Sequence, residues 1–328
     1  MGQRFSDLND AGRHSGQMPV TQDFENEDKQ LFEPPRQVNI GGGNFYNVER
    51  DLHVQINNYA PSSADERVEL VSKLRGLLAP GVNFRKIHAD VRKQRTNGTG
   101  RWLLESRLYR EWKKSANGII WWMGIPGAGK TVLASTVIED LLALESERTC
   151  VLMVYSRYTE PLTVSDILKA LVKQCVERHH ELAYVVKGVL DRHKLEDTEP
   201  SVGELVGLLQ MLEGHFDRVY YVIDGVDEAR VDVRFDLIQA INKLRGNFLL
   251  TSRPLEELGK KLACAVFCTI SAQREDMELL IEEKLERYEN LCRVLDVNSY
   301  RKELIKEVVK KADGMFLHAS LHVGRLNA

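Results

Sequence analysis

The residues best suited to chemistry lie in the octapeptide Gly124–Thr131, which reads GIPGAGKT. Its spacing fits the pattern GxxxxGK[ST], and it stands between an apolar run, IIWWM, and a helical run, TVLASTVIEDLL. Glycines in such a loop let successive backbone N–H groups turn inward around phosphate oxygens, at the amino end of the following helix. The predicted phosphate-binding residues are Gly124, Ile125, Pro126, Gly127, Ala128, Gly129, Lys130 and Thr131.

Two side chains of this loop extend the prediction from phosphate to a nucleotide with its metal ion. Lys130 supplies a positive charge for the β and γ phosphates, and Thr131 offers a hydroxyl to Mg²⁺. The alternative is a glycine-rich turn with a solvated lysine, which leaves the placement of Thr131 unexplained. We therefore expect a nucleoside triphosphate, ATP or GTP, bound with Mg²⁺.

A second group of polar residues follows the apolar strand in VYYVIDGVDE, residues 219–228. Asp224 ends the strand and is placed to hold Mg²⁺, and Asp227 or Glu228 is placed to polarise an attacking water. Acidic turns also cap strands in many proteins, but three carboxylates downstream of a phosphate loop favour the metal and catalytic roles.

A third element, NFLLTSRP, ends its apolar run at Thr251, Ser252 and Arg253. A cation at this position can sense the γ-phosphate, so Arg253 is predicted to act in the site. The alternative is an arginine that caps the strand or pairs with a surface acid.

The elements that must position these residues alternate short strands with longer helices, which is typical of a parallel sheet covered by helices. We predict strands near 119–123, 149–156, 219–224, 247–252 and 263–270, and an amphipathic helix over 164–176. After residue 271 the pattern is helical and highly charged. The predicted fold is α/β: a P-loop NTPase with a five-stranded, mainly parallel sheet, followed by a small helical subdomain.

The predicted domain organisation has five parts. Residues 1–37 read as a disordered tail because they have few aliphatic side chains, and 38–60 form a Gly/Asn-rich segment with short strands. Residues 61–98 read as a helical linker, in which Ser63 and Glu66 make a capping box. The P-loop core spans 99–270, and the helical subdomain spans 271–328.

Composition limits the classes of protein. The 45 Lys and Arg against 48 Asp and Glu give a net charge of −3, so no global positive field attracts nucleic acid or anionic membrane. The five cysteines are scattered, which argues against a disulfide framework and for a reducing cytoplasm. No segment approaches the ~18 uninterrupted apolar residues of a membrane span.

At the three motifs the chain resembles the NACHT family of signal-transducing P-loop NTPases, relatives of NLR immune receptors, in particular their fungal members. The resemblance covers about 82–325 and implies that the strand before Arg253 lies between the strands before the loop and before Asp224. It also implies that Thr99 and Gly100 lie near the nucleotide base, and that Gly314–Leu321 closes the small helical domain.

The resemblance implies a STAND-type switch, in which slow ATP or GTP hydrolysis controls conformation and self-association in defence or incompatibility signalling. The implied partners are further copies of the chain or NLR-type signalling proteins. Family members normally continue into winged-helix and repeat domains, so the chain reads as truncated at Ala328. The segment GGGNFYNV is either a signalling motif that templates β-structure or a linker or docking hairpin.

Three other functions stand as alternatives. An AAA-type NTPase acting on nucleic acid would use residues 85–114, where Lys and Arg outnumber acids, but a solvated helical face that packs its aromatic residues on the sheet is the favoured interpretation. No acceptor signature supports a small-substrate kinase. A nucleotide-binding interaction module without turnover stays open. Nucleic acid is not an expected partner.

Several isolated signals were interpreted as structural. Cys264 and Cys268 are expected to be core residues on one strand face. His318 and His322 have helical spacing but no further ligand nearby. The segment NKLR ends in Arg245 where the guanine-reading pattern needs Asp, so that code for GTP is unsupported.

Overall fold

The computed structural model describes residues 63–78, 81–255, 261–262, 264–297 and 299–325. The predicted tail over 1–37 and the Gly/Asn-rich segment over 38–60 lie outside the described residues. The chain divides at Arg50, and all described residues belong to the unit Asp51–Ala328.

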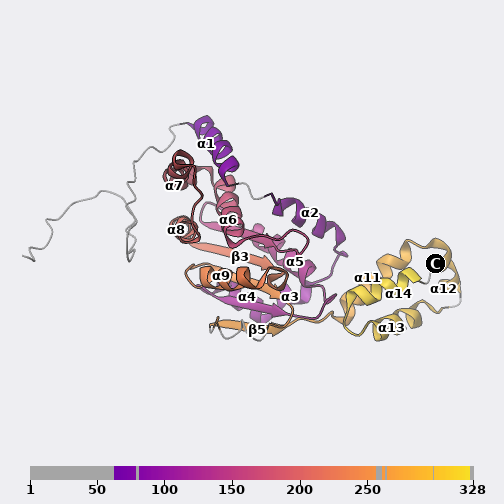
Figure 1. Ribbon diagram of the computed structural model, residues 1–328. Coiled ribbons are helices and arrows are strands. Elements are labelled where there is room, and N and C mark those ends of the chain that lie inside the picture. The colour runs from indigo at the N-terminus through magenta and orange to yellow at the C-terminus, as the bar shows by residue number, and fades with distance from the viewer. Residues whose placement is uncertain (1–62, 79–80, 256–260, 263, 298, 326–328) are drawn as a thin grey trace, which may run out of the picture. The chain divides into compact units, whose positions relative to one another are not determined.

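Five parallel strands form one sheet in the order β2-β3-β4-β1-β5 (Figure 1). The predicted α/β fold with a five-stranded sheet is therefore confirmed, and β4 lies between β1 and β3 as the resemblance implied. The strands are β1 (Ile119–Met123), β2 (Thr149–Tyr155), β3 (Arg218–Asp224), β4 (Asn247–Ser252) and β5 (Ala265–Thr269).

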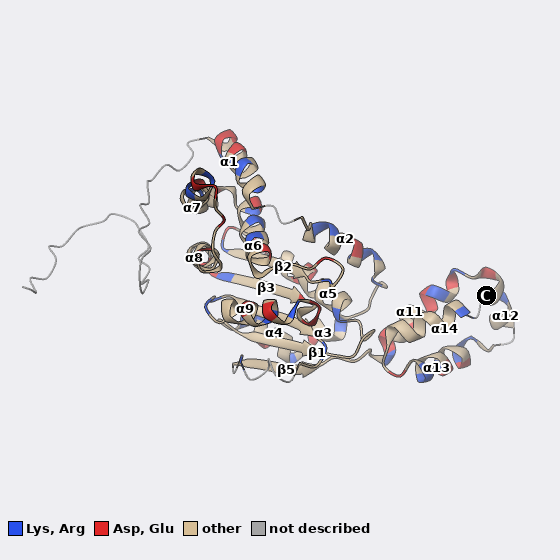
Figure 2. Ribbon diagram, in the orientation of Figure 1, with Lys and Arg blue, Asp and Glu red and all other residues tan. Residues whose placement is uncertain are grey.

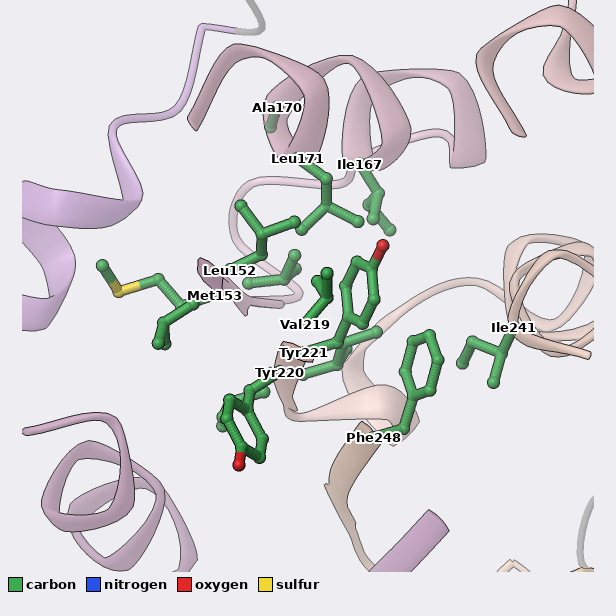
Figure 3. Close-up of a cluster of buried hydrophobic side chains, with 14 of the residues drawn as sticks. Leu152, Met153, Ile167, Ala170, Leu171, Val219, Tyr220, Tyr221, Ile241 and Phe248 are labelled. Atoms are coloured by element: carbon green, nitrogen blue, oxygen red, sulfur yellow. The ribbon is translucent and has the colours of Figure 1, made fainter. Parts of the chain in front are cut away.

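Helices cover both faces of this sheet, which explains why its central strands are continuous apolar runs. On one face lies α5 (Lys130–Leu142), and on the other α6 (Val164–Arg178) contacts α8 (Val202–Glu213) and α9 (Val231–Ile241). The consecutive residues Tyr220 and Tyr221 point to opposite faces, and Tyr221 stacks on Phe248 with ring centroids 4.4 Å apart (Figure 3).

Helices before the first strand add to the same core. The capping box of Ser63 and Glu66 begins α1 (Ala64–Leu77), as predicted, and α1 packs against α6 and α7 (Ala183–Glu196). The next helix, α2 (Phe84–Gln94), packs against α5 and β2. Both helices of the range expected to be a linker thus bury apolar side chains in the main core; the domain boundaries themselves stay a prediction.

Two short helices complete the lead-in to β1: α3 (Arg101–Glu105) and α4 (Arg107–Lys114). Trp112 is buried with its ring 5.7 Å from that of Tyr220 on β3, and the Tyr109 hydroxyl donates to Asp140 of α5. The prediction that the aromatic residues of this basic stretch pack on the sheet is confirmed for Trp112. Trp102 instead donates its indole N–H to Asp276.

Four helices after the sheet have a separate apolar cluster: α11 (Arg274–Glu286), α12 (Glu289–Val297), α13 (Arg301–Ala312) and α14 (Phe316–Arg325). Basic and acidic residues alternate on their exposed faces (Figure 2), with ion pairs four residues apart such as Arg274–Glu278. The predicted helical subdomain is confirmed. Its buried side chains include Met277, Ile281, Leu285, Ile305, Val308, Ala312, Ala319 and Val323.

The cysteine prediction at the sheet edge is wrong for one residue. Cys264 precedes β5 and is exposed, and Cys268 is half-buried. The reason is that β5 is a terminal strand of the sheet, whose Val266 and Phe267 are themselves partly exposed. Among the described residues no helix is long and apolar enough to cross a membrane.

Candidate functional site

The loop Gly124–Gly129 leaves the carboxyl end of β1 and leads directly into α5. Gly124 donates its N–H to the carbonyl of Ser252, and a Cβ at this position would lie 2.5 Å from the carbonyl oxygen of Ile270. Gly127 and Gly129 have φ values of +78° and +87°, which side chains rarely adopt. The glycines of the motif are therefore required by the backbone path of the loop.

Lys130 is the first residue of α5 and folds back over this loop. Its Nζ donates to the carbonyl oxygens of Gly124 at 2.8 Å and Ile125 at 3.1 Å. Burial lowers the pKa of Lys130, although Asp227 and Asp224 oppose the shift. Both of these acceptors are neutral carbonyl oxygens. Negatively charged phosphate oxygens at the loop would form stronger hydrogen bonds with the ammonium group.

The residues predicted to hold the metal ion lie together. Asp224 ends β3, is 4% exposed, and accepts a hydrogen bond from Thr251 Oγ1 of β4 at 2.5 Å; the Thr131 hydroxyl of α5 also favours its charged form. Burial raises the pKa of Asp224 to about 6. A carboxylate beside a hydroxyl offers the oxygen ligands that Mg²⁺ prefers, so these residues fit the ion.

Asp227 and Arg253 pair with each other at the ends of adjacent strands. The Arg253 N–H donates to Asp227 Oδ1 at 3.0 Å, and its Nε lies 3.2 Å from Oδ2. The Arg253 side chain is 56% exposed, whereas Asp227 is 11% exposed. The expected alternative, pairing with an acid, is thus present, and that acid is itself a predicted site residue.

Glu228 lies in the turn Val226–Glu228, which follows Gly225. Gly225 has a φ of +75°, and a Cβ there would lie 2.9 Å from the carbonyl oxygen of Ser156. The Glu228 carboxylate accepts from the Tyr158 N–H at 3.3 Å. Among the described residues no ion pair involves the Glu228 carboxylate, whereas that of Asp227 pairs with Arg253.

A cleft of about 700 Å³ joins these groups and is within the size range of small-molecule sites. Of the predicted residues it is lined by Pro126, Gly127, Gly129, Lys130, Thr131, Thr99, Asp224, Asp227, Glu228 and Arg253. Gly124, Ile125, Ala128 and Gly100 are not in its lining.

Thr99 and Gly100, the residues expected near the base, have separate contacts. Thr99 lines the cleft and donates its hydroxyl to the Thr96 carbonyl. Gly100 donates its N–H to Asp276 Oδ2 at 2.9 Å, and Trp102 donates to the same oxygen at 3.0 Å. Asp276, in the first turn of α11, therefore links the start of the P-loop core to the helical subdomain.

Sequence reasoning missed the contacts that the helical subdomain makes with the loop. Added Cβ atoms at Gly127 and Gly129 would lie 2.9 Å from Leu317 Cβ and 2.8 Å from the Phe316 ring. The segment GMFLHASL was predicted to close the subdomain, but nothing in its spacing shows which surface it contacts. Further lining residues that were not predicted are Lys93, Gln94, Thr96, Asp276, Leu280, Glu283, Lys284, Arg287, Phe316, Leu317 and Ser320.

One protein-family model matches the central part of the chain. Residues 98–253 match the family described as Nephrocystin 3, N-terminal. The matched range holds the phosphate loop, Asp224 and Arg253. The resemblance to NACHT-like P-loop NTPases is confirmed. No curated protein matches the chain.

Solved structures with similar folds include replication initiators. DnaA bound to AMPPCP and single-stranded DNA gives a TM-score of 0.34 at 14% identity, over 67% of this chain and 63% of that one. AMPPCP-bound DnaA from Aquifex aeolicus gives 0.33 at 16%, over 66% and 62%, and domain III of Thermotoga maritima DnaA gives 0.35 at 13%, over 69% and 82%. The chain thus spans less than two thirds of the first two. The expectation that nucleic acid is not a partner gains no support from these structures.

Proposed function

We propose that this chain is a NACHT-type nucleotide switch, which binds ATP or GTP with Mg²⁺ and hydrolyses it slowly. The bound nucleotide would control the arrangement of the helical subdomain, and thereby self-association or binding of NLR-type partners in defence or incompatibility signalling. The proposed location is the cytoplasm.

The observation that carries this proposal is the contact of α14 with the phosphate loop. Phe316 and Leu317 lie against Gly129 and Gly127, the two loop residues with positive φ. A phosphate group held by this loop would therefore meet the first turn of α14. Inverting a two-state equilibrium from 1:99 to 99:1 takes about 5.5 kcal/mol of differential binding, and micromolar affinity corresponds to about 8 kcal/mol. Nucleotide binding has enough energy to drive such a rearrangement.

In the proposed site the loop N–H groups and Lys130 hold the phosphates, and Thr131 and Asp224 hold Mg²⁺. The ion supplies charge neutralisation between the β and γ phosphates when it is bound. Ionisation of Asp224 at neutral pH is supported by its two hydroxyl neighbours, which stabilise the carboxylate against burial.

Hydrolysis is assigned to Glu228 in preference to Asp227. Both carboxylates line the cleft, but Asp227 already accepts a hydrogen bond from the Arg253 backbone N–H and forms an ion pair with the Arg253 side chain. Glu228 accepts a single long backbone hydrogen bond, so its oxygens are better placed to orient water. Arg253 would exchange Asp227 for the γ-phosphate, which makes it the residue that distinguishes triphosphate from diphosphate.

The base would lie at the wall formed by the segment before α3. Thr96 is 7% exposed, lines the cleft, and its Oγ1 has no hydrogen-bond partner among the described residues. A buried hydroxyl without a partner costs free energy, which a base or ribose atom would recover. Thr99 lies in the same wall.

The test measures nucleotide hydrolysis and oligomeric state on the same preparation of the protein. We expect slow Mg²⁺-dependent release of phosphate from ATP or GTP. We also expect a change in oligomeric state when triphosphate replaces diphosphate, which analytical ultracentrifugation measures. Glu228→Gln should slow release and preserve binding, with exposed Glu275→Gln as the control. If the wild type binds nucleotide without hydrolysing it, the chain is an interaction module without turnover. Absence of nucleotide binding would contradict the proposal.

The alternative of a nucleic-acid-directed AAA-type NTPase is tested by stimulation of turnover by DNA or RNA. Tyr109 and Trp112 are buried, so they are not available to stack on bases. Several cations of the same stretch have acidic partners, including Lys113 with Asp140. A nucleic acid would have to be bound through the remaining surface cations.

A further inference from the structure

Four side chains that commonly bind metal ions gather at the amino end of the sheet. Cys150 is the second residue of β2, Glu145 precedes that strand, and His179 follows the last residue of α6. One ligand atom each from Glu145, Cys150 and His179 lies within 4.8 Å of the other two. Cys175, four residues before His179, is buried and its thiol interacts with that of Cys150, but it is not one of the three grouped ligands.

The imidazole of His179 is directed into this cluster and lacks a partner there. The residue is 5% exposed, and its Nε2 has no hydrogen-bond partner among the described residues. Nε2 faces Glu145 Oε1 at 3.6 Å, and Nδ1 faces Glu181 Oε1 at 3.7 Å. A histidine that binds a metal commonly turns its other ring nitrogen toward a carboxylate, as His179 does here.

The surroundings offset the charge of a divalent cation. With both cysteines as thiolates and Glu145 ionised, the three ligand charges meet a 2+ ion and the Arg178 guanidinium. The half-exposed Glu181 carboxylate adds one further negative charge beside the imidazole. Arg178 Nη1 lies 3.2 Å and 3.0 Å from the two oxygens of Glu145, as an outer partner of a ligating carboxylate does. The cluster also lies at the carboxyl end of α6, where the helix dipole favours a cation.

We propose that Glu145, Cys150, Cys175 and His179 form a structural zinc site. Two sulfur atoms, one imidazole nitrogen and one carboxylate oxygen match the soft and borderline ligands of Zn²⁺. Glu145, Cys150 and His179 already lie together, and the Cys175 thiol next to Cys150 would move in to complete the tetrahedral shell. The site would fasten the start of β2 to the end of α6. The Glu145 side chain is 17% exposed, which leaves the ion a path of entry.

This site is separate from the nucleotide cleft. Cys150 and Tyr155 lie five residues apart on β2, which is about 16 Å along a strand. Tyr155 is the register partner of Asp224, so the zinc site and the magnesium site lie at opposite ends of the strands. Failure of the zinc proposal is therefore distinguishable from failure of nucleotide binding.

The experiment measures metal content in the full chain. Protein is produced in zinc-supplemented medium with a tag that lacks histidines, dialysed, and analysed by mass spectrometry of the metals. We expect about one zinc per chain in the wild type and in Cys264→Ser, which changes an exposed cysteine. At least a tenfold loss is expected in Cys150→Ser and in His179→Gln. Zinc-free wild type, or full zinc in Cys150→Ser, would overturn the proposal.

A second measurement uses only the wild type, in case the variants do not fold. Cobalt is exchanged for zinc, and the absorption spectrum is recorded. Tetrahedral cobalt with cysteine ligands gives strong visible bands and a thiolate charge-transfer band in the near ultraviolet. A spectrum without these bands would refute the site, and so would peptide mapping of zinc-free protein that finds Cys150 and Cys175 joined in a disulfide.

Discussion

Asp224→Asn is expected to stabilise the nucleotide-free fold while removing Mg²⁺-dependent binding. Burial raises the pKa of Asp224 from 3.8 to about 6, so the native state binds more protons than the unfolded state between these values. The native carboxyl is therefore a destabilising group whose cost appears as pH rises through this window and is complete above it. At about 1.4 kcal/mol per pKa unit, the cost at pH 7.5 is about 3 kcal/mol.

The same linkage sets the pH dependence of the effect. Asparagine keeps the shape of Asp224 and an oxygen that accepts from Thr251, but it carries no charge. The gain in unfolding free energy is expected to fall from about 3 kcal/mol at pH 7.5 to about 1.6 kcal/mol at pH 5.0. Urea unfolding in EDTA, without nucleotide, measures both values.

The control for this measurement is Asp217→Asn. Its hydrogen bond with Arg148 lowers the pKa of exposed Asp217, so the substitution is expected to give no gain in stability. If Asp224→Asn destabilises the protein at pH 7.5, or its effect does not shrink at pH 5.0, the buried carboxylate does not destabilise the native state as described above. If the variant still binds nucleotide with the wild-type dependence on Mg²⁺, Asp224 is not the metal ligand.

Three further substitutions test the surroundings of the cleft. Gly129→Ala should lower the unfolding free energy by at least about 1 kcal/mol and nucleotide affinity at least tenfold, because φ is +87° and the Phe316 ring is 2.8 Å from the added methyl. The control is Gly188→Ala, in open space on α7, which should stabilise the protein by about 0.5–1 kcal/mol. Thermal unfolding and nucleotide titration measure both variants. Arg253→Ala should reduce the preference for triphosphate over diphosphate about tenfold in competition titrations; equal loss for both nucleotides would indicate a structural arginine. Asp276→Ala leaves two N–H donors without their acceptor and should lower the unfolding free energy by about 1–3 kcal/mol per donor. The substitution Glu275→Ala, at an exposed neighbouring position, should change it by less than about 0.5 kcal/mol. Similar values for both variants would show that the hydrogen bonds to Asp276 do not stabilise the fold.

The strands and the phosphate loop could be predicted because their signals are local. Apolar runs such as IIWWM and VYYVID are bounded by glycine, charge or proline, and the predicted strands agree with the observed ones to within two residues. The order of the strands came from the resemblance, since no residue pattern within β4 shows that it pairs with β1 and β3. The positions of Thr131 and Asp224 follow once the two strand ends meet at one edge of the sheet.

The remaining features depend on contacts between distant segments. Asp276 receives hydrogen bonds from Gly100 and Trp102, which lie more than 170 residues earlier in the chain. Cys150 and His179 were also individually inconspicuous, because each fits an ordinary core position until the fold brings their side chains together. The prediction for Cys264 was wrong for a related reason. The alternation of residues in its segment does not reveal that β5 lies at the edge of the described sheet, with β1 on one side.

Nucleotide titration of the wild type and of Lys130→Ala tests the central claim most directly. Lys306→Ala, at an exposed position of α13, serves as the matched control, and circular dichroism checks that all three proteins are folded. We predict one Mg²⁺-nucleotide per chain for the wild type and the control, and at least a hundredfold weaker binding for Lys130→Ala, because this ammonium has its phosphate partners only in the bound state. Binding by Lys130→Ala with the affinity of the wild type would contradict the assignment of the phosphate site.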